Sequence, residues 1–203
     1  MISSRRSDSS LVSRGGRVRS ATLEGGESLS ADVFVLSAGV HSPKIARTVG
    51  VRLPIAPAKG YSATFPIKSN GGPQMRIGAV DEELLVAWCR IGDRLRMTSS
   101  AEFTGYETTY NQHDLRLIRK LASDLLPEAA EYDKGTYRAC NRPMTPDGPP
   151  ILGQAGPDNL YINSGHGHMG FTMACGSSRI VADLIDGKKT EIPVEGLTLT
   201  SRP

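Results

Sequence analysis

Apolar and polar positions alternate with a period of two in several short stretches of the chain, a pattern typical of β-strands. In GRVRSATLEGGESLS a Gly-Gly turn separates two such runs. The next stretch, ADVFVLSAG, is strongly apolar and ends in glycine, so we predict a buried central strand. HSPKIARTVG is predicted to form a short helix, and Pro54 and Pro57 mark a crossing into a different region.

The region after these prolines has the pattern of a small antiparallel sheet covered by one helix. YSATFPI, LLVAWCRI and RLRMTSSAEF are strand-like, and IGD is a plausible hairpin turn between the last two. Asn111 followed by Asp114 marks a helix start, and Pro127 ends the helix predicted over 112–126. The apolar face of this helix comprises Leu115, Ile118, Leu121, Ala122, Leu125 and Leu126.

A Pro- and Gly-rich passage, YRACNRPMTPDGPPILGQAGPDN, leads to a closing strand and helix. The strand is predicted at Leu160–Asn163 and the helix at Met169–Ile185. One stripe of this helix is predicted to pack in the core. It consists of Met173, Ser177, Ile180, Val181, Leu184 and Ile185.

The stretch SGHGHMGFTMACGS, between that strand and that helix, places Gly165, Gly167 and Gly170 at the spacing G-x-G-x-x-G. A dinucleotide fingerprint would also need a second parallel strand and an acidic residue about 20 positions on, whereas Asp183 and Asp186 lie in or at the end of the helix. We therefore predict a glycine-rich turn whose helix N-terminus offers unpaired N–H groups to an anionic or electron-rich group. A tight turn that needs glycine only for its backbone angles is the alternative.

Composition narrows the function classes. Among the 203 residues 38% are hydrophobic and 22% charged, which is ordinary for a globular protein. The net charge is +3 with Arg and Lys scattered, so no nucleic-acid partner is expected. No apolar run approaches the roughly 18 residues that span a bilayer, so a cytoplasmic protein is expected, with peripheral membrane attachment left open. Cys89, Cys140 and Cys175 are far apart, so we expect reduced, mostly buried thiols and no metal site.

The segment NRPMTPDGPPILG, residues 141–153, is the most distinctive in the chain. Four prolines and an Asp-Gly turn stiffen it, so Arg142 is expected to be presented from a rigid backbone. An arginine held in this way can bind a carboxylate through two parallel hydrogen bonds. The alternative is an arginine paired with a structural acid such as Asp147.

Several of these segments resemble one family. RPMTPDGPPILG followed by NLYINSGHGHMGFTMACGSSRIVADLIDG looks like the C-terminal part of the D-amino-acid dehydrogenase small subunit. That subunit belongs to the FAD-dependent amino-acid oxidoreductases, with D-amino-acid oxidase, glycine oxidase and sarcosine oxidase. ADVFVLSAG, PAKGYSATFPI and GDRLRMTSSAEFTGY resemble the same subunit in the same order, so the resemblance covers about residues 15–187.

The resemblance implies an α/β plus α+β fold, namely the C-terminal part of an FAD-binding Rossmann-like domain with an inserted antiparallel-sheet substrate domain. The expected domains are a partial FAD-binding domain at 1–52, a substrate-binding domain at 53–140, and a return to the FAD-binding domain with the C-terminal helix at 141–203. Family members begin with a strand, a true G-x-G-x-x-G and an acidic residue, which do not lie upstream of residue 10 here. We therefore expect a fragment or split subunit, partnered by an N-terminal half or by self-association.

The resemblance also assigns residues. Arg142 matches the arginine that binds the substrate carboxylate, while Tyr61 and Tyr106 either line the substrate pocket or simply pack in that domain. Ala38 and Gly39 match the turn near the FAD pyrophosphate. The residues that match the loop facing the flavin ring are Gly165, His166, Gly167, His168, Met169, Gly170, Phe171 and Thr172. His168 stands where the dehydrogenases tend to carry Thr, a departure that can alter the substrate edge of the flavin.

The implied activity is FAD-dependent oxidative deamination of a D-amino acid, with hydride passing from Cα to flavin N5 and water hydrolysing the imino acid. No catalytic side chain and no metal are assigned. Oxygen and a quinone stay open as the final acceptor, and with the quinone a peripheral membrane link. Two other readings stay open as well: a catalytically silent remnant that associates with partners, and a small-anion binding module that uses Arg142 without flavin.

Overall fold

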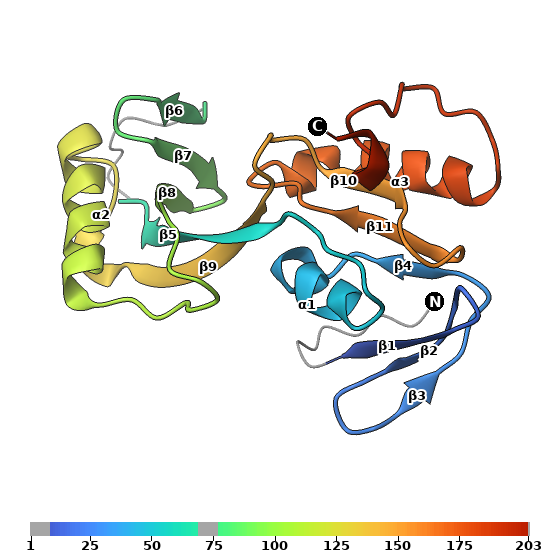
Figure 1. The fold of residues 1–203 in the computed structure, drawn as a ribbon. Coiled ribbons are helices and arrows are strands. Elements are labelled where there is room, and N and C mark those ends of the chain that lie inside the picture. The colour runs from blue at the N-terminus through green and yellow to red at the C-terminus, as the bar shows by residue number, and fades with distance from the viewer. Residues whose placement is uncertain (1–8, 69–76, 203) are drawn as a thin grey trace. The chain divides into compact units, whose positions relative to one another are not determined.

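The structure of the protein is a computed structural model that describes residues 9–68 and 77–202 (Figure 1). It contains two compact units, unit 1 being Met1–Pro57 with Arg142–Pro203 and unit 2 being Ala58–Asn141. The sequence predicted boundaries after residues 52 and 140, which are five residues and one residue earlier than the observed divisions at 57 and 141.

The described residues of unit 1 form two small sheets and two α-helices. The first sheet has the order β1-β2-β3 with antiparallel neighbours, formed by Ser10–Arg14, Arg17–Thr22 and Ser28–Leu29. The second has the order β10-β11-β4, formed by Ile151–Gln154, Leu160–Ser164 and Phe34–Leu36. The helices are α1 at Ser42–Arg47 and α3 at Gly170–Ile185, with short 3-10 turns η1 at Gly39–His41 and η3 at Leu199–Ser201.

The sheet β10-β11-β4 is the middle layer of unit 1, because alternate residues of its strands face two different cores. Ile151, Leu160 and Ile162 pack with residues of β1, β2 and α1. Leu152 and Tyr161 pack instead against α3. The closing strand and helix therefore lie as predicted from the sequence, with the helix on one face of the sheet (Figure 1).

Strand β4 is shorter and more exposed than predicted. It pairs in parallel with β11, with Leu36 opposite Ile162, and has no second neighbouring strand within the described residues. Val33 is 39% exposed and Val35 48% exposed. The prediction of a buried central strand was wrong for the described chain, because only one edge and one face of β4 are covered.

A buried asparagine joins the two sheets of unit 1. Asn159 is 3% exposed, and its Oδ1 accepts a hydrogen bond from the Val18 N–H at 2.8 Å. Its Nδ2 donates to the carbonyl oxygens of Val18 and Asp32, both at 3.0 Å. One side chain thus satisfies three backbone groups from β2 and from the segment that leads into β4.

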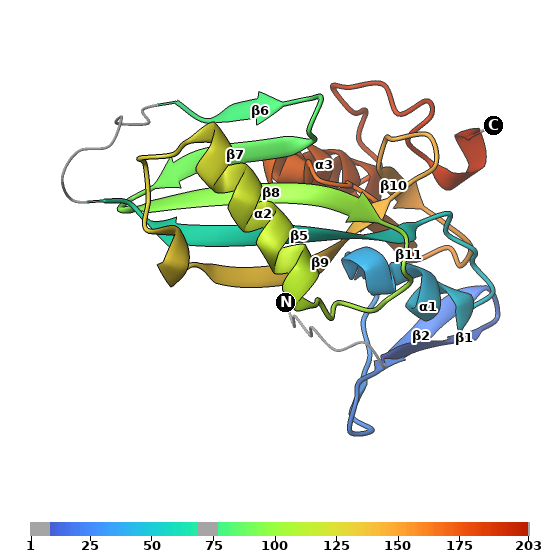
Figure 2. The same cartoon turned by 90° about the vertical axis from the view of Figure 1, so that its left-hand side faces the viewer.

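Unit 2 is built on a five-stranded sheet with α2, Gln112–Leu125, lying across one face (Figure 2). Among the described strand pairs β6–β7, β7–β8 and β5–β8 are antiparallel. The strand order is β6-β7-β8-β5-β9, formed by Ala79–Asp81, Val86–Ile91, Arg94–Glu102, Ala56–Pro66 and Thr136–Met144. Ile118 and Ala122 of α2 share a core with Phe65 and Met97, and a 3-10 turn, η2, spans Tyr132–Lys134.

The local signals predicted for unit 2 are confirmed. Asn111 Oδ1 accepts from the N–H groups of His113 and Asp114 at 2.7 and 3.1 Å, and Asp114 Oδ2 accepts from the Asn111 N–H at 2.9 Å. This is a capping box, and it starts α2 where the sequence indicated. The hairpin between β7 and β8 turns at Gly92 and Asp93.

The thiols are more exposed than predicted. Cys140 and Cys175 are exposed and Cys89 is half-buried, so the prediction of mostly buried thiols was wrong. Cys140 occupies an outward position in the alternation along β9, and Cys175 lies in the exposed first half of α3. Across residues 9–68 and 77–202, no helix has both the length and the apolar content needed to cross a bilayer.

Candidate functional site

Two turns meet at one edge of the middle sheet of unit 1. Strands β4 and β11 are parallel neighbours, so their carboxyl ends lie together. The first strand leads into Ala38 and Gly39, and the second leads into the glycine-rich turn at Gly165. The carboxyl ends of parallel strands are where α/β folds bind their ligands, so this edge is a candidate ligand site.

A buried serine pair holds the two turns together. Ser164 Oγ donates a hydrogen bond to the carbonyl oxygen of Gly39 at 3.2 Å and accepts one from Ser42 Oγ at 3.0 Å. Ser164 is 1% exposed and Ser42 is fully buried. Neither serine stands out in the sequence, because the two positions are 122 residues apart and carry no motif.

The glycines of the second turn are needed for space as well as for backbone angles. Gly165 has φ +85°, and a Cβ there would lie 2.8 Å from Thr145 Cγ2. Gly167 has φ +56°, and a Cβ there would lie 3.1 Å from Met144 Sδ. The turn therefore packs directly on the segment that follows Arg142, which an L side chain at either position would push away.

The N-terminus of α3 is open. Met169 occupies the N-cap position, and no side chain of the described residues caps the helix. The first-turn N–H groups therefore have no partner inside the helix, and the positive end of the helix dipole lies beside them. Phe171 is 99% exposed, and His168, Met169 and Thr172 are also exposed.

The predicted apolar stripe of α3 is buried only in its second half. Ser177, Ile180 and Val181 are buried, and Leu184 and Ile185 pack beside them. Met173 is 39% exposed, so its predicted place in the core was wrong. The reason is that the sheet beneath the helix covers its last turns and leaves its first turns open.

Two polar atoms next to the glycine turn are buried without a hydrogen-bond partner among the described residues. They are Asn163 Oδ1 and His166 Nε2. Burial lowers the pKa of His166 below its ordinary value, which favours the neutral imidazole. Buried polar groups in native proteins are nearly always paired, so a bound polar group or an ordered water beside the turn would satisfy these two atoms. Asn163 could not be predicted from the sequence, because one asparagine in a short strand gives no signal.

Arg142, which the sequence predicted to be presented from a rigid backbone, lies on strand β9. It is the third residue from the end of β9 and is half-buried. The next residue, Pro143, accepts a hydrogen bond through its carbonyl oxygen from the Gly167 N–H at 2.9 Å. The backbone that carries Arg142 is therefore fixed to the glycine turn. Asp147, named as an alternative partner for Arg142, forms an ion pair with Arg202.

The two predicted tyrosines belong to unit 2. Tyr61 is 5% exposed, and its Oη donates to Glu102 Oε2 at 2.9 Å. Lys59 Nζ lies 3.2 Å from the same oxygen, and burial raises the pKa of the Tyr61 phenol. These contacts favour packing over substrate contact for Tyr61. Tyr106, which follows β8, is 38% exposed.

Unit 1 thus brings together Arg142, the turn at Ala38 and Gly39, and the glycine turn with the start of α3. Its chemistry is that of backbone N–H groups, one arginine and two unpaired buried polar atoms. No group of three or more His, Cys, Asp or Glu side chains suited to a metal ion occurs in the described parts of the chain. The N–H groups and the arginine are suited to an anionic or electron-rich group.

Comparison with known proteins agrees with this chemistry. Residues 6–184 match the model of the FAD dependent oxidoreductase family. The chain is 43% identical over 185 residues to D-amino acid dehydrogenase 2 of Mesorhizobium japonicum, covering 91% of this chain and 44% of that protein. It is also 43% identical over 188 residues to D-amino acid dehydrogenase of Paramagnetospirillum magneticum, covering 93% of this chain and 44% of that protein.

Solved structures show the same fold at lower identity. Iminodiacetate oxidase from Chelativorans sp. BNC1 matches with a TM-score of 0.80 at 21% identity, over 94% of this chain and 52% of that one. Glycine oxidase from Geobacillus kaustophilus matches with a TM-score of 0.79 at 20% identity, over 96% of this chain and 50% of that one. The chain spans about half the length of the proteins that it matches.

Proposed function

Because the chain belongs to the family of FAD-dependent oxidoreductases, we propose that it forms part of a flavin-dependent dehydrogenase of D-amino acids. The observation that carries the proposal is the hydrogen bond from the Gly167 N–H to the Pro143 carbonyl. This bond joins β9, which carries Arg142, to the glycine turn. Arg142 is suited to binding a carboxylate, and the turn is suited to an electron-rich ring. An amino-acid oxidoreductase needs these two features side by side.

The residues around the turns fit the cofactor of this family, FAD. The uncapped N–H groups of the first turn of α3, from Gly170 to Thr172, would face the electron-rich edge of the flavin ring, while Ala38 and Gly39 would lie near the pyrophosphate. A Cβ at Gly39 would meet nothing within 4 Å, so the turn leaves room for a ligand. The unpaired Asn163 Oδ1 and His166 Nε2 would gain a polar partner.

Arg142 would hold the substrate. A guanidinium presents a planar fork of donors that matches a carboxylate, so it would fix the orientation of the amino acid as well as bind it. The position of Arg142 on β9 supports this role, because a strand that belongs to a sheet holds a side chain more firmly than a free loop does.

The chemistry divides between cofactor and protein. FAD, when bound, supplies the acceptor, flavin N5, for the hydride that leaves the substrate Cα. The start of α3 would stabilise the negative charge that develops at the ring edge, through its dipole and its free N–H groups. The imino acid product would then be hydrolysed by water to a keto acid and ammonia.

The rest of such an enzyme would come from sequence outside this chain. The dehydrogenases that it matches are more than twice as long, since it covers 44% of each. We propose that a segment like their unmatched part provides the remaining FAD contacts, as a separate chain or as a continuation of this one. The exposed residues of β4 and of the first turns of α3 are surfaces that such a segment could cover.

The test is reconstitution. The chain is purified alone and together with the unmatched part of the Mesorhizobium japonicum relative, and FAD binding is followed by flavin absorbance and fluorescence. We expect a flavin spectrum and reduction of a dye by D-amino acids, but not by their L-enantiomers, in the reconstituted sample. Flavin binding without D-amino-acid oxidation would refute the proposed substrate class, and no flavin binding in either sample would refute the enzyme proposal altogether.

A further inference from the structure

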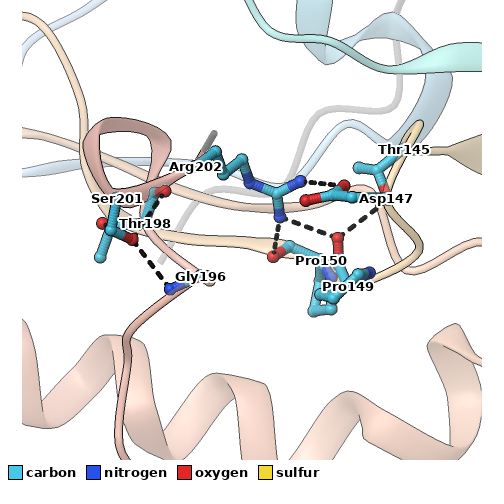
Figure 3. A network of polar contacts seen from close by, with 8 residues as sticks. All are labelled: Thr145, Asp147, Pro149, Pro150, Gly196, Thr198, Ser201 and Arg202. Carbon is cyan, nitrogen blue, oxygen red and sulfur yellow. Dashed lines mark hydrogen bonds and ion pairs between the residues drawn. The ribbon is translucent and has the colours of Figure 1, made fainter.

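Arg202 binds a segment that lies more than fifty residues before it (Figure 3). Its Nη1 lies 2.5 Å from Asp147 Oδ1, and the Arg202 side chain is only 7% exposed. Its Nη2 donates to the carbonyl oxygens of Pro149 and Pro150 at 2.8 and 2.6 Å. One guanidinium therefore contacts three residues of the turn after β9.

The same turn is braced from within. Thr145 Oγ1 donates to the carbonyl oxygen of Pro149 at 2.9 Å, so Pro149 accepts from both Thr145 and Arg202. Prolines have no backbone N–H to donate, and the fixed φ of Pro149 and Pro150 limits how this turn can rearrange. The turn at 145–150 is thus held by one hydrogen bond within it and by the contacts from Arg202.

The other end of this segment contacts the glycine turn. Pro143 accepts from the Gly167 N–H, and Thr145 Cγ2 and Met144 Sδ occupy the space that side chains at 165 and 167 would need. Arg142 directly precedes these residues on β9. A shift of the 145–150 turn would therefore change both the position of Arg142 and the packing of the glycine turn.

We propose that Arg202 is a positioning residue, which holds the 142–150 segment against the glycine turn and so sets the place of Arg142. The contacts of Arg202 carry the inference that the segment is held in place, and the effect on substrate binding rests on the proposed function. Arginine suits this position because its planar fork places Nη1 on Asp147 and Nη2 on the two carbonyl oxygens, whereas a lysine ammonium donates from a single nitrogen.

The segment before Arg202 is attached to unit 1 by contacts of its own. Replacing Arg202 is therefore expected to leave this segment in place. The Leu197 carbonyl accepts from the Leu152 N–H of β10 at 2.8 Å, and Val194 and Leu197 pack beside α3. Ser201 closes the η3 turn by accepting from the Gly196 N–H at 3.0 Å and from Thr198 Oγ1 at 2.7 Å. Ser201→Ala would loosen that turn and leave the Arg202 contacts in place, so it is the matched control.

The first measurement is amide exchange by NMR in the purified chain, comparing Arg202→Ala with Ser201→Ala. The Arg202 clamp is the set of contacts from Arg202 to Asp147, Pro149 and Pro150. The exchange rate of the Gly167 amide, which is distant from Arg202 in sequence, reports whether this clamp holds the segment in place. The amide of Val18, which donates to Asn159 in the core, reports global opening. We expect Gly167 to exchange about tenfold faster in Arg202→Ala, which is typical of losing charge-assisted hydrogen bonds, with Val18 unchanged. Equal exchange of Gly167 in the two variants, or equal acceleration of both amides in Arg202→Ala, would overturn the positioning role.

The second measurement uses the reconstituted protein and tests the link to the substrate. Arg202→Ala should raise KM for the D-amino acid about tenfold while kcat changes little, and Arg202→Lys should restore only part of the loss. Faster Gly167 exchange with an unchanged KM would overturn the claim that the clamp sets Arg142. Wild-type protein that oxidises no D-amino acid would refute the proposed function, and the exchange result would still decide whether the clamp exists.

Discussion

Ser164 Oγ donates to the carbonyl oxygen of Gly39 at 3.2 Å, across 125 residues of sequence. The bond joins the turn after β4 to the turn after β11 at the carboxyl ends of two parallel strands. Since Ser42 Oγ donates to Ser164 Oγ in turn, the three residues form a buried chain of hydrogen bonds. The candidate cofactor site is therefore a fixed feature of unit 1.

Replacing these serines should lower the free energy of unfolding, and more for Ser164→Ala than for Ser42→Ala. Ser164→Ala leaves both the Gly39 carbonyl and the Ser42 hydroxyl without this partner, so we expect the free energy of unfolding to fall by about 1 to 3 kcal/mol. Ser42→Ala leaves the bond from Ser164 to Gly39 intact and should cost less. Ser178→Ala, at an exposed position of α3, is the control. Urea denaturation gives the three values, and equal losses for all three variants would contradict the hydrogen-bond chain.

Asn159 offers a stronger test of how unit 1 is held together. Asn159→Ala removes the partner of three backbone groups, and we expect a loss of at least about 3 kcal/mol, because each unsatisfied buried group costs about 1 to 3 kcal/mol. Asn159→Asp keeps the acceptor for the Val18 N–H and loses both donors, so it should be destabilising as well.

A matched control for Asn159 is Gln154→Ala. Gln154 Nε2 also donates to two carbonyl oxygens, those of Gly156 and Pro157, but its residue is exposed. Water can replace these bonds, so the loss should stay below about 1 kcal/mol. Thermal unfolding of the four proteins compares them, and a Gln154 variant as unstable as the Asn159 variants would show that burial is not the cause.

Local sequence signals predicted much of the fold. The capping box at Asn111, the turn at Gly92 and Asp93, and the strand and helix around the glycine turn all follow from residues within a few positions of one another. Short-range hydrogen bonds and backbone preferences decide such features, so they can be read from the chain alone. The strands β9 and β10 were missed because their prolines and glycines indicated a loop.

The parts that could not be predicted depend on contacts between distant residues. Nothing near Asp147 indicates that its partner is Arg202, and nothing near Ser164 indicates Ser42 or Gly39. The exposure of Met173 and Val35 has the same origin, because periodicity shows which face of an element is apolar but not how far a neighbour covers it. The glycine turn was predicted, whereas its dependence on Thr145 required the structure.

The close approach of Gly165 to Thr145 predicts that Gly165→Ala is destabilising and that a second substitution at position 145 restores part of the stability. Gly165→Ala should destabilise unit 1 because its Cβ would lie 2.8 Å from Thr145 Cγ2, in addition to the strain of φ +85°. Gly187→Ala, at φ +66° with no atom within 4 Å, should show the backbone cost alone, about 1 to 2 kcal/mol. We expect Gly165→Ala to cost at least about 1 kcal/mol more.

The rescue is Thr145→Ser, which removes Cγ2 and keeps the hydroxyl that donates to Pro149. In that background Gly165→Ala should lose only about as much stability as Gly187→Ala. Chemical denaturation of the single and double variants measures the coupling between positions 145 and 165. Additive effects of the two substitutions would show that the methyl group is not the obstacle.

His166 predicts a loss of stability at acidic pH. Burial lowers its pKa in the folded protein, so the unfolded chain, with a pKa of about 6.5, binds a proton first as the pH falls. The contribution of His166 is therefore fully present above about pH 6.5 and is lost as the pH falls below that value towards the folded pKa. His166→Gln should show a smaller decrease in the free energy of unfolding between about pH 7.5 and about pH 5.5.

His168→Gln is the control for this pH dependence, since His168 is an exposed neighbour on the same turn. Each variant removes one histidine from the same turn, so His166→Gln should reduce the slope of stability against pH more than His168→Gln does. Urea titrations across the pH range provide the slopes. A His166 variant with the wild-type slope would place the responsible proton on another group.

Arg142 links the structure to the proposed reaction. Arg142→Ala in the reconstituted protein should cost on the order of 2 to 5 kcal/mol in kcat/KM, as removing one side of a desolvated charge pair does. Arg142→Lys keeps the charge without the planar fork, so it should chiefly raise KM. Arg138→Ala is the control, because Arg138 lies on the same strand but is exposed. Steady-state kinetics with a D-amino acid decide the matter: kcat/KM of Arg142→Ala equal to that of Arg138→Ala would remove Arg142 from the substrate site, whatever the flavin spectrum shows.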